Sequence, residues 1–187
     1  MIGPLREEIV SLIPSMKLYH NVLYDKEIKK IKELANPKLK RLSIDTNEDI
    51  SLRKVASFRK HNDEVFETIH RRLAQISSKP TTNISDKYVV TNYGIGGHYL
   101  PHTKHIDDDH LINSKRQNAI VIIHMDDVPK GGATVVPDVK VCVPSVKGSA
   151  LVIYKTGNTF TPIGKFTQYG SCPIIYGDKW TLTAWFK

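Results

Sequence analysis

Cysteine is nearly absent from this sequence, in which Cys142 and Cys172 are the only two among 187 residues. Two separated cysteines cannot build the dense disulfide framework of a small secreted domain, so that class of protein is excluded. Cys142 lies in a short β-branched segment, where we expect a small buried side chain of a strand. The chain is 40% hydrophobic, and at this length it can bury an ordinary core as one domain over residues 1–187.

Long apolar runs are also missing. No stretch approaches the roughly 20 apolar residues of a membrane-spanning helix, so we expect no membrane span. The first residues, MIGPLREEIVSLIPS, lack the basic leader, apolar core and small-residue cleavage site of a secretory signal, and none is predicted. Internal repeats and low-complexity tracts, which would indicate solenoids or disordered segments, do not occur either.

Acidic residues are in the minority, with 19 Asp and Glu against 27 Lys and Arg and a net charge of +8. Much of the excess lies in residues 25–41, which could form a surface for nucleic acid or another acidic partner. No aromatic residues are interleaved with these lysines, and Ile28, Ile31 and Leu34 share one face at helical spacing. We therefore interpret the segment as the solvated face of an amphipathic helix and expect no nucleic-acid partner.

The first third of the chain has a helical pattern. One helix is predicted from Asp25, as its N-cap, to about Ala35, where an Asn-Pro pair follows. A second helix is predicted to begin near Asn62 or Asp63, because apolar residues then recur at steps of three and four.

The pattern changes from Lys87 onward, where short β-branched and aromatic segments alternate with Gly, Pro, Asn and Asp. The predicted strands are KYVVTNY, NAIVIIHM, ATVVP, VKVCV, ALVIY and WTLTAWF. Helices followed by many short strands predict an α+β fold. We expect a double-stranded β-helix (jelly roll) over about 87–187, with helical support over about 1–80 packed on one sheet. A small ligand could bind in the mouth between its two sheets.

Four motifs occur in a fixed order within these segments. They are NYGIGGHYLPH, DDVPKGGATVVPD, VKGSALVIY and CPIIYGDKW. Their order and spacing resemble the catalytic domain of collagen prolyl 4-hydroxylase alpha subunits, iron(II)/2-oxoglutarate dioxygenases, and the N-terminal segment is similar to insect members. The family's separate N-terminal peptide-binding and dimerisation region has no counterpart, so a fragment and a shortened paralogue both stay open.

The resemblance implies a peptidyl-proline hydroxylase of the endoplasmic reticulum lumen. Its cofactors would be iron(II), 2-oxoglutarate and ascorbate. Its partners would be a proline-rich or collagen-like peptide and a disulfide isomerase subunit.

The iron site departs from the family pattern. The resemblance implies a His-x-Asp pair and a distal histidine, which leave positions open for 2-oxoglutarate and oxygen. His102 matches the first ligand, whereas Lys104 replaces the aspartate and Tyr169 replaces the distal histidine. A lysine ammonium has no lone pair, and a neutral phenol is a poor ligand for iron(II), so we expect no functional iron centre.

The residues expected to bind the cosubstrate are retained. By the resemblance, Lys179 holds the far carboxylate of 2-oxoglutarate, and Tyr93 and Thr134 add hydroxyl groups. One positive charge with short hydrogen bonds suits a carboxylate. Tyr99 and Trp185 match the positions that line the family's proline-binding groove.

The first functional hypothesis is a catalytically degenerate hydroxylase, which keeps the fold and a dicarboxylate pocket but does not turn over. Further changes favour it: a family arginine aligns best with Gln117, although Arg116 is adjacent, and a family histidine aligns with Lys187. In this hypothesis the Lys104 ammonium takes the vacated position of the cation.

Two alternatives stay open. An active dioxygenase could use displaced ligands such as His105 and Asp107, although a three-residue shift along a strand turns side chains to the opposite face. A binding module could grip an extended proline-rich peptide through Tyr99 and Trp185 without hydroxylating it.

Overall fold

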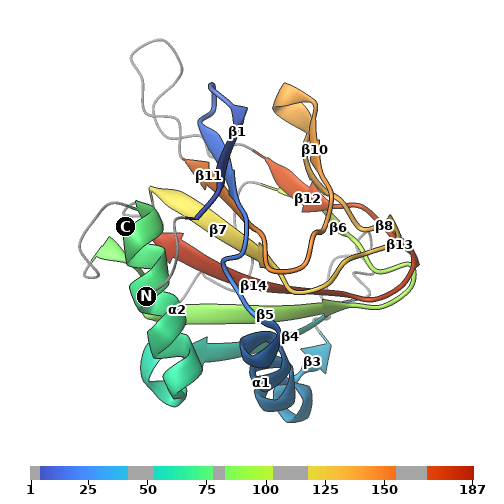
Figure 1. The fold of residues 1–187 in the computed structure, drawn as a ribbon. Helices are drawn as coiled ribbons and strands as arrows, with labels where there is room; N and C mark the ends of the chain where they lie inside the picture. The colour runs from blue at the N-terminus through green and yellow to red at the C-terminus, as the bar shows by residue number, and fades with distance from the viewer. Residues whose placement is uncertain (1–4, 42–52, 78–82, 103–117, 155–167) are drawn as a thin grey trace.

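The fold is built on a large antiparallel sheet that carries two helices on one face and a smaller sheet on the other (Figure 1). The computed structural model describes residues 5–41, 53–77, 83–102, 118–154 and 168–187. Within these residues, no helix is both long and apolar enough to cross a membrane.

The large sheet combines strands from both ends of the chain. Its spatial order is β1 (Glu7–Ser11), β2 (Met16–Tyr19), β11 (Ala150–Tyr154), β7 (Ala119–His124), β14 (Lys179–Phe186), β5 (Lys87–Tyr93), β4 (Arg53–Arg59) and β3 (Lys40–Arg41).

The smaller elements complete the architecture. The four-stranded sheet has the order β10 (Val141–Val143), β9 (Thr134–Val136), β12 (Tyr169–Ser171) and β6 (Tyr99–His102), and β13 (Ile174–Tyr176) pairs with β8 (Lys130–Gly131). The helices are α1 (Asp25–Ala35) and α2 (Glu64–Ser77), with short 3-10 turns η1 (Asn36–Lys38), η2 (Lys60–Asn62) and η6 (Pro137–Val139).

Helix α1 covers the predicted range, but its N-terminus is stabilised differently from the prediction. Asp25 is the first helical residue rather than the N-cap. The Glu27 carboxylate instead accepts the Tyr24 backbone N–H at 3.0 Å, and the Arg72 guanidinium of α2 donates two hydrogen bonds of 2.8 Å to Glu27. This partly buried fork of two parallel hydrogen bonds fixes α1 to α2.

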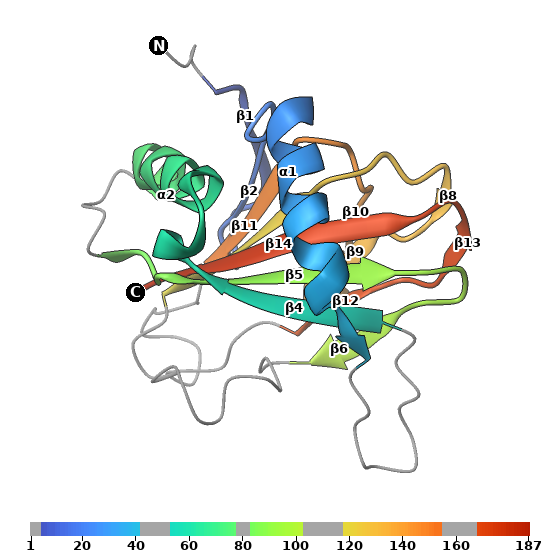
Figure 2. The same ribbon diagram turned by 90° about the horizontal axis from the view of Figure 1, so that it is seen from below.

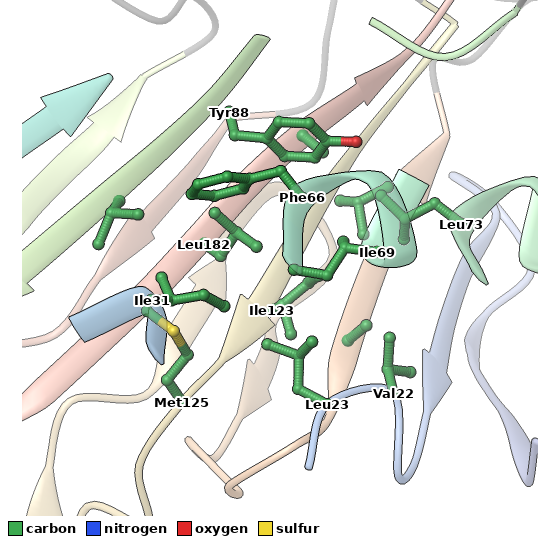
Figure 3. Packing of buried hydrophobic residues seen from close by; sticks show 14 of the residues in the cluster. Val22, Leu23, Ile31, Phe66, Ile69, Leu73, Tyr88, Ile123, Met125 and Leu182 are labelled. Atoms are coloured by element: carbon green, nitrogen blue, oxygen red, sulfur yellow. The ribbon is translucent and has the colours of Figure 1, made fainter. Parts of the chain in front are cut away.

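The helices cover one face of the large sheet through a continuous apolar cluster (Figures 2 and 3). Phe66 of α2 is fully buried and stacks against Phe58 of β4 and Tyr88 of β5, with ring centroids 4.8 and 5.5 Å away. Burying a side chain of this size contributes roughly 2–3 kcal/mol. The cluster accounts for the amphipathic pattern that predicted both helices.

The opposite face of the large sheet packs against the small sheet. Alternate residues of β5, β7 and β14 point to this inner face, where an apolar cluster includes Val89, Ile122 and Trp185. These central strands are covered on both faces, and their content of β-branched and aromatic residues made them predictable from the sequence. The sheet also holds the candidate site on this inner face.

Two sequence expectations differ from the structure. The first third contains strands β1 to β4 besides its two helices, and these strands were not predicted. Cys142 lies on β10 as expected but its side chain is exposed, so the prediction of a small buried residue is wrong. The small sheet is only partly covered, and its outer side faces water at this position. The jelly-roll assignment stays a prediction.

Candidate anion-binding site

The candidate site is organised by one row of residues across three neighbouring strands. Arg53 of β4 lies directly opposite Tyr93 of β5, and Tyr93 lies directly opposite Lys179 of β14. Directly opposed residues point to the same face of a sheet, so all three side chains project toward the small sheet. Arg53 and Lys179 are each only 1% exposed, so both cations lie in the interior between the two sheets.

These side chains line a cavity between the two sheets. The space between the atoms here amounts to about 360 Å³, a figure that includes open solvent at its mouth. Its described lining consists of Arg53, Thr91, Tyr93, Tyr99, Ile122, Thr134, Tyr169, Gly170, Ser171, Lys179, Thr181 and Thr183. That set carries two cations and no carboxylate.

Lys179 is held at the base of the cavity by neutral acceptors. Its ammonium donates to the Gly132 carbonyl at 2.6 Å, to the Ser171 hydroxyl at 2.8 Å and, more weakly, to the Thr134 hydroxyl at 3.4 Å. Burial lowers the pKa of Lys179 to about 8. The long Thr134 bond is the one that an incoming carboxylate can replace at least cost, because a charged acceptor binds an ammonium more strongly.

A buried histidine determines which hydroxyl can serve a ligand. Ser149 donates its hydroxyl proton to the Val146 carbonyl at 2.7 Å, so it accepts from Nδ1–H of His124 at 3.0 Å. Burial, and then the charge of Lys179, lower the pKa of His124 to about 3, so its ring is neutral and Nε2 has no proton. Nε2 therefore accepts the Thr134 hydroxyl at 3.1 Å.

This chain of hydrogen bonds changes the expected role of Thr134. With its only proton given to His124, Thr134 faces Lys179 as an acceptor and cannot donate to a carboxylate. Ser171 accepts from Lys179 and keeps its own O–H to donate. Ser171 was missed by the sequence reasoning, although its position two residues after Tyr169 in a strand places both side chains on one face.

Arg53 is the second residue that the sequence reasoning missed. Its guanidinium carbon lies 3.6 Å from the centre of the Tyr99 ring, which is a close stacking contact. Burial raises the pKa of Tyr93 to about 12, against the opposing charge and hydrogen bond of Arg53. Tyr93 is therefore a neutral phenol between the two cations, and its ring centre is 5.5 Å from the Lys179 nitrogen.

Two of the three positions that the resemblance assigns to iron ligands, His102 and Tyr169, lie in a cluster of tilted aromatic rings. His102 lies opposite Tyr169 in the pairing of β6 with β12, with ring centroids 4.6 Å apart, and the Tyr99 ring covers His102 at 3.8 Å. His102 Nδ1–H donates to the Leu100 carbonyl at 2.9 Å, which leaves Nε2 as its lone-pair nitrogen. Lys104 lies outside the described residues.

The chemistry of these donors does not suit iron(II). A site for non-haem iron(II) combines two imidazoles with a carboxylate. Here one imidazole, His102, faces the phenol of Tyr169, and a phenol is not among the ligand types of that site. Within the described ranges, no three His, Cys, Asp or Glu side chains come together to hold a metal.

The remaining predicted residues fall in two groups. Tyr99 forms part of the cavity wall, whereas Trp185 is 2% exposed within the apolar cluster between the sheets. Their peptide-binding role stays a prediction. His105 and Asp107, the alternative iron ligands, lie outside the described residues.

Comparisons with known proteins agree with the motifs. No protein-family model matches the chain. The prolyl 4-hydroxylase subunit alpha-3 of Rattus norvegicus is 32% identical over 198 residues, which cover 99% of this chain and 36% of that subunit. The chain thus spans about a third of the length of this curated relative.

Solved structures show the same fold. The crystal structure of a viral collagen prolyl hydroxylase from Paramecium bursaria Chlorella virus-1, a 2OG complex, matches with a TM-score of 0.69 at 18% identity, over 91% of this chain and 93% of that one. A prolyl hydroxylase from Trichoplax adhaerens, in complex with a peptide fragment of hypoxia inducible factor, matches with a TM-score of 0.62 at 12% identity, over 91% and 82%. The resemblance predicted from the four motifs is confirmed, and the chain is a homologue of prolyl 4-hydroxylase alpha subunits over its whole length.

Proposed function

We propose that this chain is a degenerate prolyl 4-hydroxylase-like protein, which binds a small dicarboxylate such as 2-oxoglutarate but does not hold iron(II) or hydroxylate proline. One observation carries the proposal. The cavity keeps a buried ammonium, Lys179, with hydroxyl groups beside it, whereas a phenol, Tyr169, stands at a position where the family has an iron ligand.

The two ends of the cavity support dicarboxylate binding without iron binding. Lys179 and Ser171 can hold one carboxylate of 2-oxoglutarate by two charge-assisted hydrogen bonds, one from the ammonium and one from the hydroxyl. When bound in the family, iron(II) supplies the positive charge for the other end of the cosubstrate and activates oxygen. Among the described residues, the donors at these positions are His102 and Tyr169, which are too few and too weak for that metal.

The finer features of the resemblance belong to the same proposal. A jelly-roll topology would place the cavity in the mouth between the sheets. A proline-rich peptide could approach across Tyr99, by analogy with the neighbour that is described in complex with a peptide fragment. A disulfide isomerase partner and the endoplasmic reticulum lumen follow from the family alone, and ascorbate would have no role without iron.

The proposal is tested by measuring ligand and metal binding separately. We expect 2-oxoglutarate to bind in the presence of a chelator by titration calorimetry, no stoichiometric binding of Fe²⁺ or Mn²⁺, and no succinate release with a proline-rich peptide. Stoichiometric iron binding or succinate release would instead support an active enzyme with displaced ligands such as His105 and Asp107, and would refute the proposal.

A gain-of-function variant sharpens this test. Lys104→Asp combined with Tyr169→His restores the two replaced ligand types beside His102. We expect this double variant to bind Mn²⁺ where the parent chain does not, because it provides two imidazoles and a carboxylate. Each single variant is the matched control, since a site with only two ligands remains weak.

A further inference from the structure

We infer that Arg53 replaces the metal as the second cation of the cavity, which makes the site a metal-independent clamp for dicarboxylates with a carboxylate at each end. The inference rests on the proposed function for the Lys179 end and adds the other end. It also names the ligand class more closely. A metal selects a 2-oxo acid because it needs the oxo group for chelation, whereas a guanidinium needs only the carboxylate.

The register of the sheet places the two cations at a suitable spacing. Arg53 and Lys179 are separated by the single strand β5, with Tyr93 between them. Neighbouring strands lie about 4.8 Å apart, so the Cα atoms of the two cations are about 10 Å apart. The terminal carboxyl carbons of an extended five-carbon diacid are about 5 Å apart from ordinary bond lengths, which leaves room for one ion pair at each end.

The geometry of Arg53 prepares it for a carboxylate. Its flat face is covered by the Tyr99 ring at 3.6 Å, and this contact holds the guanidinium plane. The five N–H groups lie in that plane, so they are directed to the rim, where a carboxylate can accept two parallel hydrogen bonds. Stacking on a ring leaves the positive charge in place.

The charge balance of the cavity favours a dianion. Arg53 and Lys179 are both almost completely buried, and the described lining contains no carboxylate. A ligand with two separated negative charges meets both cations at once, whereas a monocarboxylate leaves one of them without a ligand partner.

The test compares acids of equal length in the presence of a chelator. Glutarate and pentanoate differ by one carboxylate, and glutarate and 2-oxoglutarate differ by the oxo group. We expect glutarate to bind at least about tenfold more tightly than pentanoate, because pentanoate has no second carboxylate to accept the two parallel hydrogen bonds of Arg53. We expect glutarate and 2-oxoglutarate to bind within about threefold of each other.

Variants test whether Arg53 causes the difference in affinity between glutarate and pentanoate. Arg53→Gln is expected to weaken the binding of glutarate about tenfold and to leave the binding of pentanoate unchanged. Lys179→Gln is expected to weaken the binding of both acids. Lys54→Gln is the matched control, because Lys54 is the exposed neighbour on the opposite face of β4. If Arg53→Gln does not fold, Arg53→Lys tests the same point, since it keeps the charge and loses the fork.

The outcomes separate this inference from the proposed function. Equal affinity for glutarate and pentanoate, or unchanged glutarate affinity in Arg53→Gln, would overturn the role of Arg53 while leaving the Lys179 site intact. No binding of any of the three acids would overturn the proposed function itself. Tighter binding of 2-oxoglutarate but not glutarate on adding Mn²⁺ would show that a metal still supplies the second charge, and would overturn both.

Discussion

Lys179 makes the affinity for a dicarboxylate depend on pH in a way that can be calculated. Burial lowers the pKa of its ammonium from 10.5 to about 8, while the carboxyl groups of the ligand ionise near pH 4. A bound carboxylate stabilises the charged ammonium, so binding above about pH 8 requires the uptake of a proton. We therefore expect full affinity below about pH 7 and a progressive loss above about pH 8.

The size of the effect follows from the fraction of charged Lys179. With a pKa of about 8, roughly 90% of this side chain is protonated at pH 7 and roughly 10% at pH 9, so the affinity falls about tenfold, or about 1.4 kcal/mol. Titration calorimetry in buffers of different ionisation enthalpy measures the affinity and the proton uptake together. The uptake is expected to rise from about 0.1 to about 0.9 protons per ligand over this range.

Two control variants test whether the pH dependence of the affinity comes from Lys179. Lys179→Gln is expected to bind weakly and without a pH slope, whereas Lys54→Gln keeps the slope. In the ligand-free protein, the same pKa shift makes the stability of the fold increase with pH, whereas the affinity for the ligand decreases. Its unfolded state binds the proton more tightly, so stability rises by up to about 1.4 kcal/mol per pH unit between about pH 8 and 10. Constant affinity from pH 7 to 9 without proton uptake would refute the reasoning.

Other predictions concern the parts of the fold that support the site. Phe66→Ala removes a fully buried ring and should lower the free energy of unfolding by about 3–5 kcal/mol in urea titrations; a loss below about 1 kcal/mol would contradict the packing. Gly148→Ala should destabilise by about 1–3 kcal/mol, because φ is +78° and the new Cβ would lie 2.6 Å from a backbone oxygen. Gly94→Ala, with nothing within 4 Å, should be close to neutral in the same urea titrations. Arg72→Lys keeps the charge but loses the fork to Glu27, so we expect a loss of about 1–3 kcal/mol; a double-mutant cycle with Glu27→Gln should show coupling, and strict additivity would disprove it.

Elements with a strong local pattern were predictable. Helix α1 carries apolar residues at helical spacing, and its range Asp25–Ala35 agrees with the structure. Strand β7, AIVIIH, is a continuous apolar run up to its final histidine, and β5 and β14 combine aromatic and β-branched residues. Strand β4, RKVASFR, was missed because it mixes charged and small residues with few β-branched ones. Its conformation depends on pairing with β5, which no local pattern encodes.

The same contrast holds within the candidate site. Tyr93, Thr134 and Lys179 were selected by resemblance, and the structure brings all three to one cavity. The donor role of Thr134 could not be judged from the sequence, since it depends on a proton accepted by His124, ten residues away on another strand. Arg53 reads as an ordinary surface cation, and only its register with Tyr93 turns it inward.

The row of Arg53, Tyr93 and Lys179 has a consequence for how ligand binding and folding are linked. The three residues come from the beginning, the middle and the end of the chain and meet only when β4, β5 and β14 are all paired. A ligand that bridges the row therefore has no affinity for partly assembled sheets. Its binding should raise the free energy of complete unfolding, by about 2.7 kcal/mol at a hundredfold excess over Kd, and should protect the amides of all three strands from hydrogen exchange to the same extent.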